Sequence, residues 1–213
     1  MRRLAASVCA AVLLAGCINL EVGGKAGRAD LAYFDLAGGQ AASPGGATPR
    51  AIALRSVDVV APTWLDVPAM QYRLAYADPA RRASFIESRW AAPPPELLQQ
   101  VLRRQLSGAE SRGAPGPCRL QIEVDEFVQV FDSPQSSSGL IELRAALLAR
   151  ADAPVARKTF RASRPAQSAD ARGGVAALAA ATGDLATAIR DWLDASGSDS
   201  ANGVANAVRC RAN

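Results

Sequence analysis

The sequence predicts an α+β fold: a two-layer sandwich in which two helices cover one face of a mainly antiparallel sheet. Three observations lead to this prediction. Alternating apolar and polar residues mark strands in both halves of the chain. Two segments with helical spacing, around residues 96–106 and 170–194, each follow a group of strands. The strands and helices do not alternate strictly, as they would in a parallel α/β fold.

The first residues have the pattern of a secretory signal. Arg2 and Arg3 precede the apolar run 4–14, which is too short to cross a bilayer, since a spanning helix needs about 20 residues. Leu14-Ala15-Gly16-Cys17 then resembles the lipobox of bacterial lipoproteins. That resemblance implies removal of the signal peptide 1–16 and acylation of Cys17, with chains such as palmitate. The alternative is an ordinary signal peptide that happens to contain a cysteine.

The residue after the cysteine bears on sorting. It is Ile18, not the aspartate that retains lipoproteins at the inner membrane of enteric-type bacteria. We therefore expect an anchored protein on the periplasmic face of the outer membrane. Residues 17–29 include several glycines and read as a lipidated tether. Residues 30–196 are expected to form a single domain, and 197–213 a polar C-terminal tail.

Composition excludes several function classes. The 213 residues include 24 basic and 20 acidic side chains and no histidine. Without histidine, zinc enzymes, Ser-His-Asp hydrolases and Cys-His proteases are not expected, and no metal or cofactor is predicted. The net charge of +4 falls to +2 when the signal leaves with two arginines. Because the basic residues are spread evenly, nucleic acid is not an expected partner.

The first half of the domain contains four predicted strands and one helix. Residues 31–36 and 51–60 read as strands, the second with a bulge near Arg55-Ser56. After the proline-bracketed turn 62–68, alternating residues from Met70 to Tyr76 predict a strand. The remaining elements are a return strand at 84–90 and a helix that opens at Pro93-Pro94-Pro95-Glu96 and ends before Gly108.

The second half predicts a three-strand meander and a long helix. The even positions Leu120, Ile122, Val124, Val128 and Val130 are apolar and the odd positions Gln121, Glu123, Asp125 and Gln129 are polar, which marks a strand with one buried face. A hairpin loop is expected over 132–139, followed by strands around 141–149 and 155–162. Residues 170–194 read as the final helix.

Two cysteines remain after the signal and the lipid attachment site are set aside. Cys118 and Cys210 form an even pair in a compartment that supports disulfides, so we predict a bridge between them. The alternative is two independent thiols.

At several positions the chain resembles the family of ABC-type transport auxiliary lipoproteins, which includes the lipoprotein of the paraquat-inducible system. The resemblance spans about Tyr33 to Leu193 and rests on the order and spacing of short stretches. They are Tyr33-Phe34-Asp35-Leu36, Val59-Val60-Ala61-Pro62-Thr63-Trp64-Leu65-Asp66, Met70-Gln71-Tyr72-Arg73, Ser88-Arg89-Trp90 and 120–131.

The resemblance implies a non-enzymatic accessory subunit of an intermembrane lipid transport system. Its expected partner is the tunnel protein with mammalian-cell-entry (MCE) domains that works with an inner-membrane permease and ATPase, and a homo-oligomer is also implied. An alternative is an envelope-assembly scaffold that acts on an outer-membrane β-barrel.

Five side chains are candidates for partner contact: Trp64, Asp66, Arg73, Arg89 and Trp90. Tryptophan supplies large contact area at low entropic cost, but tryptophans are highly buried on average, which favours the core as the alternative for Trp64 and Trp90. Asp66, Arg73 and Arg89 could pair with one another or stay solvated.

Overall fold

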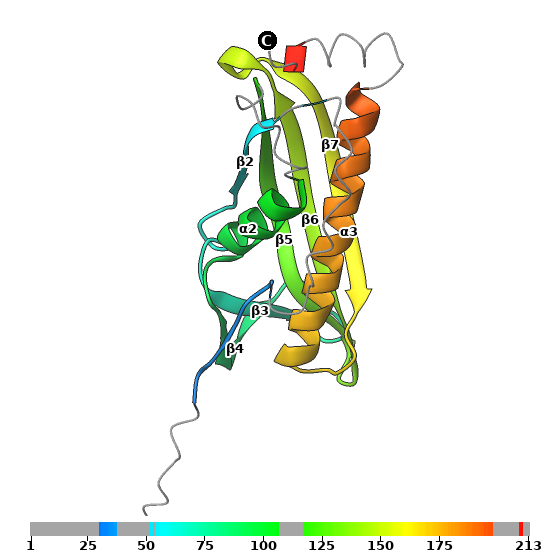
Figure 1. The fold of residues 1–213 in the computed structure, drawn as a ribbon. Helices are drawn as coiled ribbons and strands as arrows, with labels where there is room; N and C mark the ends of the chain where they lie inside the picture. The colour runs from blue at the N-terminus through cyan, green and yellow to red at the C-terminus, as the bar shows by residue number, and fades with distance from the viewer. Residues whose placement is uncertain (1–29, 38–51, 53, 107–116, 198–208, 211–213) are drawn as a thin grey trace, which may run out of the picture. The chain divides into compact units, whose positions relative to one another are not determined.

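The computed structural model describes residues 30–37, 52, 54–106, 117–197 and 209–210 (Figure 1). These described residues confirm the predicted α+β class, with one seven-stranded sheet and two α-helices among them. The strands are β1 (Ala32–Phe34), β2 (Leu54–Val60), β3 (Ala69–Leu74), β4 (Arg82–Trp90), β5 (Cys118–Ser133), β6 (Ser136–Leu148) and β7 (Pro154–Pro165); the helices are α2 (Pro94–Leu106), α3 (Ala171–Gly197) and a short 3-10 turn at Arg150–Asp152.

Strand β5 is the central strand of the sheet and pairs along both of its edges. One of its edges pairs with β6 along its whole length, and β6 pairs with β7, so the predicted antiparallel meander is confirmed. Its other edge is shared by two strands: β2 pairs with 118–123 and β3 pairs with 129–131. Both pairings are parallel, and so is that of β1 with β4. The sheet is therefore more mixed than predicted, although its longest pairings are antiparallel.

A bulge in β5 changes which side chains face the helices. The register with β6 shifts between Val124 and Glu126, so Asp125 is an extra residue in the ladder. Before the bulge the even positions are buried, as predicted, but after it Phe127, Gln129 and Phe131 take the helix side. Beyond Asp125 the predicted alternation is thus wrong for Phe127, Gln129 and Phe131, because a one-residue insertion exchanges the two faces of a strand, although Val128 is buried as predicted.

The hairpin between β5 and β6 is tighter than the predicted loop 132–139. The strands continue to Ser133 and from Ser136, so only two residues lie between them. Ser137 is buried, and its hydroxyl accepts a hydrogen bond from Nε2 of Gln129. The serines of this segment therefore belong to the sheet instead of forming a solvated loop.

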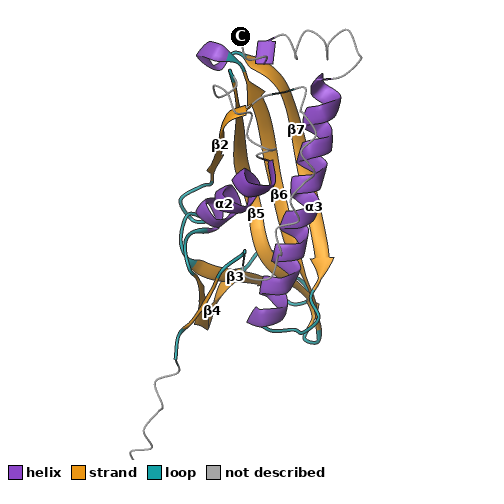
Figure 2. Cartoon of the chain, in the orientation of Figure 1, coloured by secondary structure: helices purple, strands orange, loops and turns teal. Residues whose placement is uncertain are grey.

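The two helices lie on the same side of the sheet (Figure 2) and share one hydrophobic core. Leu98 and Leu102 from α2 and Leu185 and Ile189 from α3 are almost fully buried there. The N-terminal half of α3 runs very close to β6: a Cβ atom on Gly139 would lie 2.7 Å from the backbone nitrogen of Leu178. Glycine at 139 is thus what permits this packing distance.

Helix α2 also covers the free edge of β2. The side-chain oxygen of Gln99 accepts from the backbone N–H of Val59, and Nε of Arg103 donates to the carbonyl of Val57. This N–H and this carbonyl are backbone groups of β2 that point away from β5 and do not hydrogen-bond with it. The helix thereby blocks addition of another strand at this edge.

Several predictions concern residues outside the described part of the chain. The signal peptide 1–16, Cys17, the tether 17–29 and most of the tail 197–213 lie there. In the tail the structure describes Gly197, Arg209 and Cys210; Cys210 is buried and joined to Cys118 at the start of β5 by a disulfide. Among the described residues, neither α-helix has the combination of length and apolar character that a membrane span requires.

Candidate interaction surface

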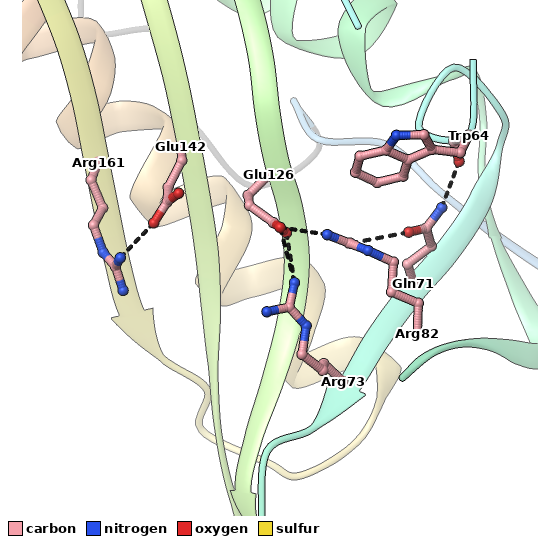
Figure 3. A network of polar contacts seen from close by, with 7 residues as sticks. All are labelled: Trp64, Gln71, Arg73, Arg82, Glu126, Glu142 and Arg161. Carbon is pink, nitrogen blue, oxygen red and sulfur yellow. Dashed lines mark hydrogen bonds and ion pairs between the residues drawn. The ribbon is translucent and has the colours of Figure 1, made fainter. Parts of the chain in front are cut away.

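One face of the sheet, turned away from α3, carries a connected set of polar side chains (Figure 3). At its centre, Glu126 of β5 binds two arginines from neighbouring strands. Nη2 of Arg73 in β3 donates to both carboxylate oxygens at 3.0 Å, and Nη2 of Arg82 in β4 donates to Oε1. Arg82 also reaches the side-chain oxygen of Gln71. We call Trp64, Gln71, Arg73, Arg82 and Glu126 the open-face network.

The strand register explains why these residues meet. Arg73 and Arg82 are directly opposite in the β3–β4 ladder, which places two like charges side by side. Arg73 is also paired with Val130 of β5, so its side chain lies on the same face as Glu126. The bulge at Asp125 is what puts Glu126 on this face. A single carboxylate then offsets the repulsion of the two guanidinium groups.

Trp64 lies at the rim of the network. The turn before β3 is held by hydrogen bonds from the backbone N–H groups of Leu65 and Asp66 to the carbonyl of Pro62. Leu65 fills the core under this turn, while Trp64 stays 43% exposed. Its ring lies over Arg82, whose Cζ is 4.3 Å from the ring centroid, and its carbonyl accepts from Nε2 of Gln71. The indole is therefore exposed but fixed in position.

Ion pairs continue across the same face. Glu142 of β6 accepts from Arg161 of β7, and Arg144 pairs with both Asp125 and Glu123. Hydrogen bonds from Arg144 to Asp125, together with the charges of Asp125 and Glu123, raise the pKa of Arg144 above its usual range. The face is thus rich in charges that are largely balanced by cross-strand neighbours.

The other sequence-predicted contact residues have different environments. Arg73 pairs with Glu126, not with Asp66, and Asp66 is exposed. Arg89 donates to the backbone carbonyls of Phe85, Ile86 and Ser88 within its own strand. The ion pair considered for Asp66, Arg73 and Arg89 is therefore wrong.

Trp90 belongs to the core. It is 2% exposed and its ring packs edge-to-face on Phe127, with centroids 5.4 Å apart. A side chain this deeply buried offers no area to a partner, so the expectation that Trp90 contacts one is corrected.

The open-face network combines an exposed tryptophan with charges that are paired among themselves. Each of its charged groups is held by an opposite charge, which leaves none poised as a general base. Among the residues that the structure describes, no group of three or more cysteines or acidic side chains is placed to hold a metal ion. What the network offers is a rigid, half-exposed indole surrounded by polar groups.

Sequence reasoning did not propose three members of the network, Gln71, Arg82 and Glu126, as contact residues. Glu126 interrupts the apolar even positions of its strand, and that break was the available signal for a bulge. Arg82 lies in a run of two arginines after a turn, where nothing in the spacing indicates a partner more than forty residues away.

Comparisons with known proteins agree with this fold. The family model described as "ABC-type transport auxiliary lipoprotein component" matches residues 34–190. A crystal structure of a Xanthomonas campestris protein of family DUF330 is similar with a TM-score of 0.61 and 24% identity, over 72% of this chain and 89% of that one. A second, whose printed description is "uncharacterized protein", has a TM-score of 0.59 and 16% identity, over 77% and 99%. These two likenesses support the fold alone. No curated protein matches the chain.

Proposed function

This chain belongs to the family of ABC-type transport auxiliary lipoprotein components, and on that premise we propose that it is a lipid-anchored subunit that docks the MCE-domain tunnel protein of an intermembrane lipid transport system at the outer membrane. The family is one of membrane-anchored transport components and not of enzymes. Anchoring would come from acylation of Cys17, since two or more buried chains hold a protein firmly on a bilayer. A homo-oligomer is part of the same proposal.

The observation that best supports a docking role is the fixed position of Trp64. Tryptophan is the residue most enriched among interface positions that dominate binding energy, and a pre-positioned side chain loses little entropy on binding. Here Arg82 and Gln71 hold the indole and its backbone. The paired charges around it would form the polar rim of such an interface.

A crosslinking experiment tests the partner. A photoreactive amino acid at position 64 in the full, acylated chain should trap an MCE-domain protein in native membranes. The matched control carries the same group at Tyr76, which is an exposed aromatic outside the network. Crosslinks to an integral β-barrel would instead favour the envelope-assembly scaffold. Equal crosslinking from positions 64 and 76, or no crosslink to any transport component, would contradict the docking role of Trp64.

A further inference from the structure

The edge of the sheet formed by β1 and β4 carries three exposed, large apolar side chains. Leu31 is 41% exposed, Tyr33 66% and Ile86 85%, and Ile86 is the most exposed large apolar side chain among the described residues. In the parallel β1–β4 ladder, Ala32 pairs with Ser88 and Tyr33 with Arg89. Leu31, directly before β1, and Tyr33 are two residues apart and therefore share one face, and Ile86 lies in the neighbouring strand β4, two residues before Ser88. We call Leu31, Tyr33 and Ile86 the edge patch.

Ile86 lies in a bulge of β4. The ladder with β3 pairs Ala69 with Arg89 but Gln71 with Ser84, so the residues of β4 between these pairs lack a regular partner on β3. The guanidinium of Arg89 donates to the carbonyls of Phe85, Ile86 and Ser88 and satisfies the backbone of the bulge. Ile86 is thus exposed within an internally bonded bulge and not at a frayed end.

The position of the patch along the chain indicates what covers it. Only residues 18–30 separate the predicted lipid attachment site from Leu31. Whatever its conformation, a chain of that length spans at most about 45 Å. An acylated Cys17 would therefore hold this edge near the bilayer at an effective concentration on the order of millimolar. Contacts too weak to bind a free domain are populated under that condition.

We propose that the edge patch rests in the interfacial layer of the membrane that holds the lipid anchor; this proposal depends on the acylation of Cys17 proposed above. Tyrosine is enriched in that layer, where its ring is buried and its hydroxyl stays hydrated. Of the charged residues near the patch, Asp30, Asp35 and Glu87 are acidic and exposed, Arg89 is engaged with backbone carbonyls, and Arg172 lies over the ring of Phe34. The surface therefore matches a zwitterionic bilayer better than an anionic one.

Site-specific fluorescence quenching tests the proposal. In the full chain Cys118 and Cys210 are bonded to each other, so a cysteine introduced by Ile86→Cys can be labelled once Cys17 is acylated. The labelled protein is placed on phosphatidylcholine vesicles that carry a nitroxide near the headgroup. The control label is at Arg157→Cys, an exposed site on β7 that is far from the edge patch. Across the sheet, Arg157 pairs with Ala146 of β6, which pairs with Gln121 of β5. Gln121 lies ten residues, or about 33 Å, along β5 from Phe131, where β5 pairs with β3.

The label at 86 should be quenched at least about twofold more than the label at 157. A second pair of proteins removes the concern that the label itself inserts. In this pair the label is at Glu87→Cys, and adding Ile86→Asp should lower its quenching to the level at position 157. Without Ile86→Asp, quenching of the label at 87 should fall as the fraction of anionic lipid in the vesicles is increased.

Equal quenching at 86 and 157, or no effect of Ile86→Asp, overturns the membrane contact. The membrane contact is also overturned if added membrane proteins shield the label while the lipid nitroxide does not quench it. The patch would then be a protein-binding surface. Failure of the chain to float with vesicles would refute the proposed anchor itself, whereas flotation without quenching at 86 refutes only the edge contact.

Discussion

The guanidinium of Arg82 lies 4.3 Å from the centre of the Trp64 ring. The same guanidinium donates to Glu126, so the turn before β3 and the central strand β5 are connected through one side chain. This arrangement fixes an exposed tryptophan on the open face of the sheet. It also makes Glu126 the residue on which the local geometry depends.

The first prediction concerns that carboxylate. Glu126→Gln should lower the free energy of unfolding by about 1–2 kcal/mol, since it leaves two partly buried guanidinium groups without their shared counter-charge. Glu142→Gln is the matched control. It removes the partner of Arg161, whose side chain is 67% exposed, and should cost less than about 0.5 kcal/mol. Urea denaturation measures both; equal losses would show that Glu126 has no special role.

The second prediction is a pH dependence at the start of α3. The backbone N–H of Gly173 and the hydroxyl of Ser168 donate to Asp170 and hold the pKa of its carboxyl below the usual value of 3.8. A lowered folded pKa means that the charged form stabilises the helix at neutral pH and that this contribution is lost as pH falls through the folded pKa. Asp170→Ala should therefore cost about 1 kcal/mol at pH 7 and less in strong acid.

Asp170→Asn provides the control for that experiment, because asparagine can cap a helix without a charge. Its stability relative to Asp170→Ala should not depend on pH. Chemical denaturation across the acid range gives the comparison. A gap between wild type and Asp170→Ala that stays constant down to the lowest pH would disprove the proposed linkage.

The third prediction uses the turn between β6 and β7. Ala151 has φ of 55° and Asp152 of 57°, in the left-handed region that favours glycine or asparagine. Ala151→Gly should stabilise the protein by about 0.5–1 kcal/mol. The neighbouring Ala153 has φ of −64°, so Ala153→Gly should bring no gain. Thermal unfolding of the two variants checks this; a loss of stability in Ala151→Gly would count against strain at this residue.

The fourth prediction concerns the disulfide. Cys118 and Cys210 are 92 positions apart, and the chain-entropy model assigns a closed loop of this size about 4–5 kcal/mol. The double variant Cys118→Ser, Cys210→Ser should therefore unfold at clearly lower urea concentration. Treatment of the wild-type protein with a reductant should reproduce the shift and leave the double variant unchanged. An effect of reductant on the double variant would point to another cause.

The sequence by itself determined the local elements, and it predicts a lipid anchor at Cys17, which lies outside the described residues. The lipobox-like stretch before Cys17, the helices near residues 94–106 and 171–197, and the bulge close to Ser56 all follow from patterns within short windows. Such patterns are readable because capping, periodicity and turn chemistry depend on neighbours in the chain.

Only the tertiary structure decided which strands are neighbours. Periodicity reports that a strand has a buried face, but it does not say that β2 and β3 share one edge of β5 in parallel. The bulge at Asp125 then turned Glu126 toward Arg73 and Arg82 and sent Gln129 into the core. These outcomes depend on hydrogen-bond partners far apart in the chain, and their free energy is gained only when the whole sheet is assembled.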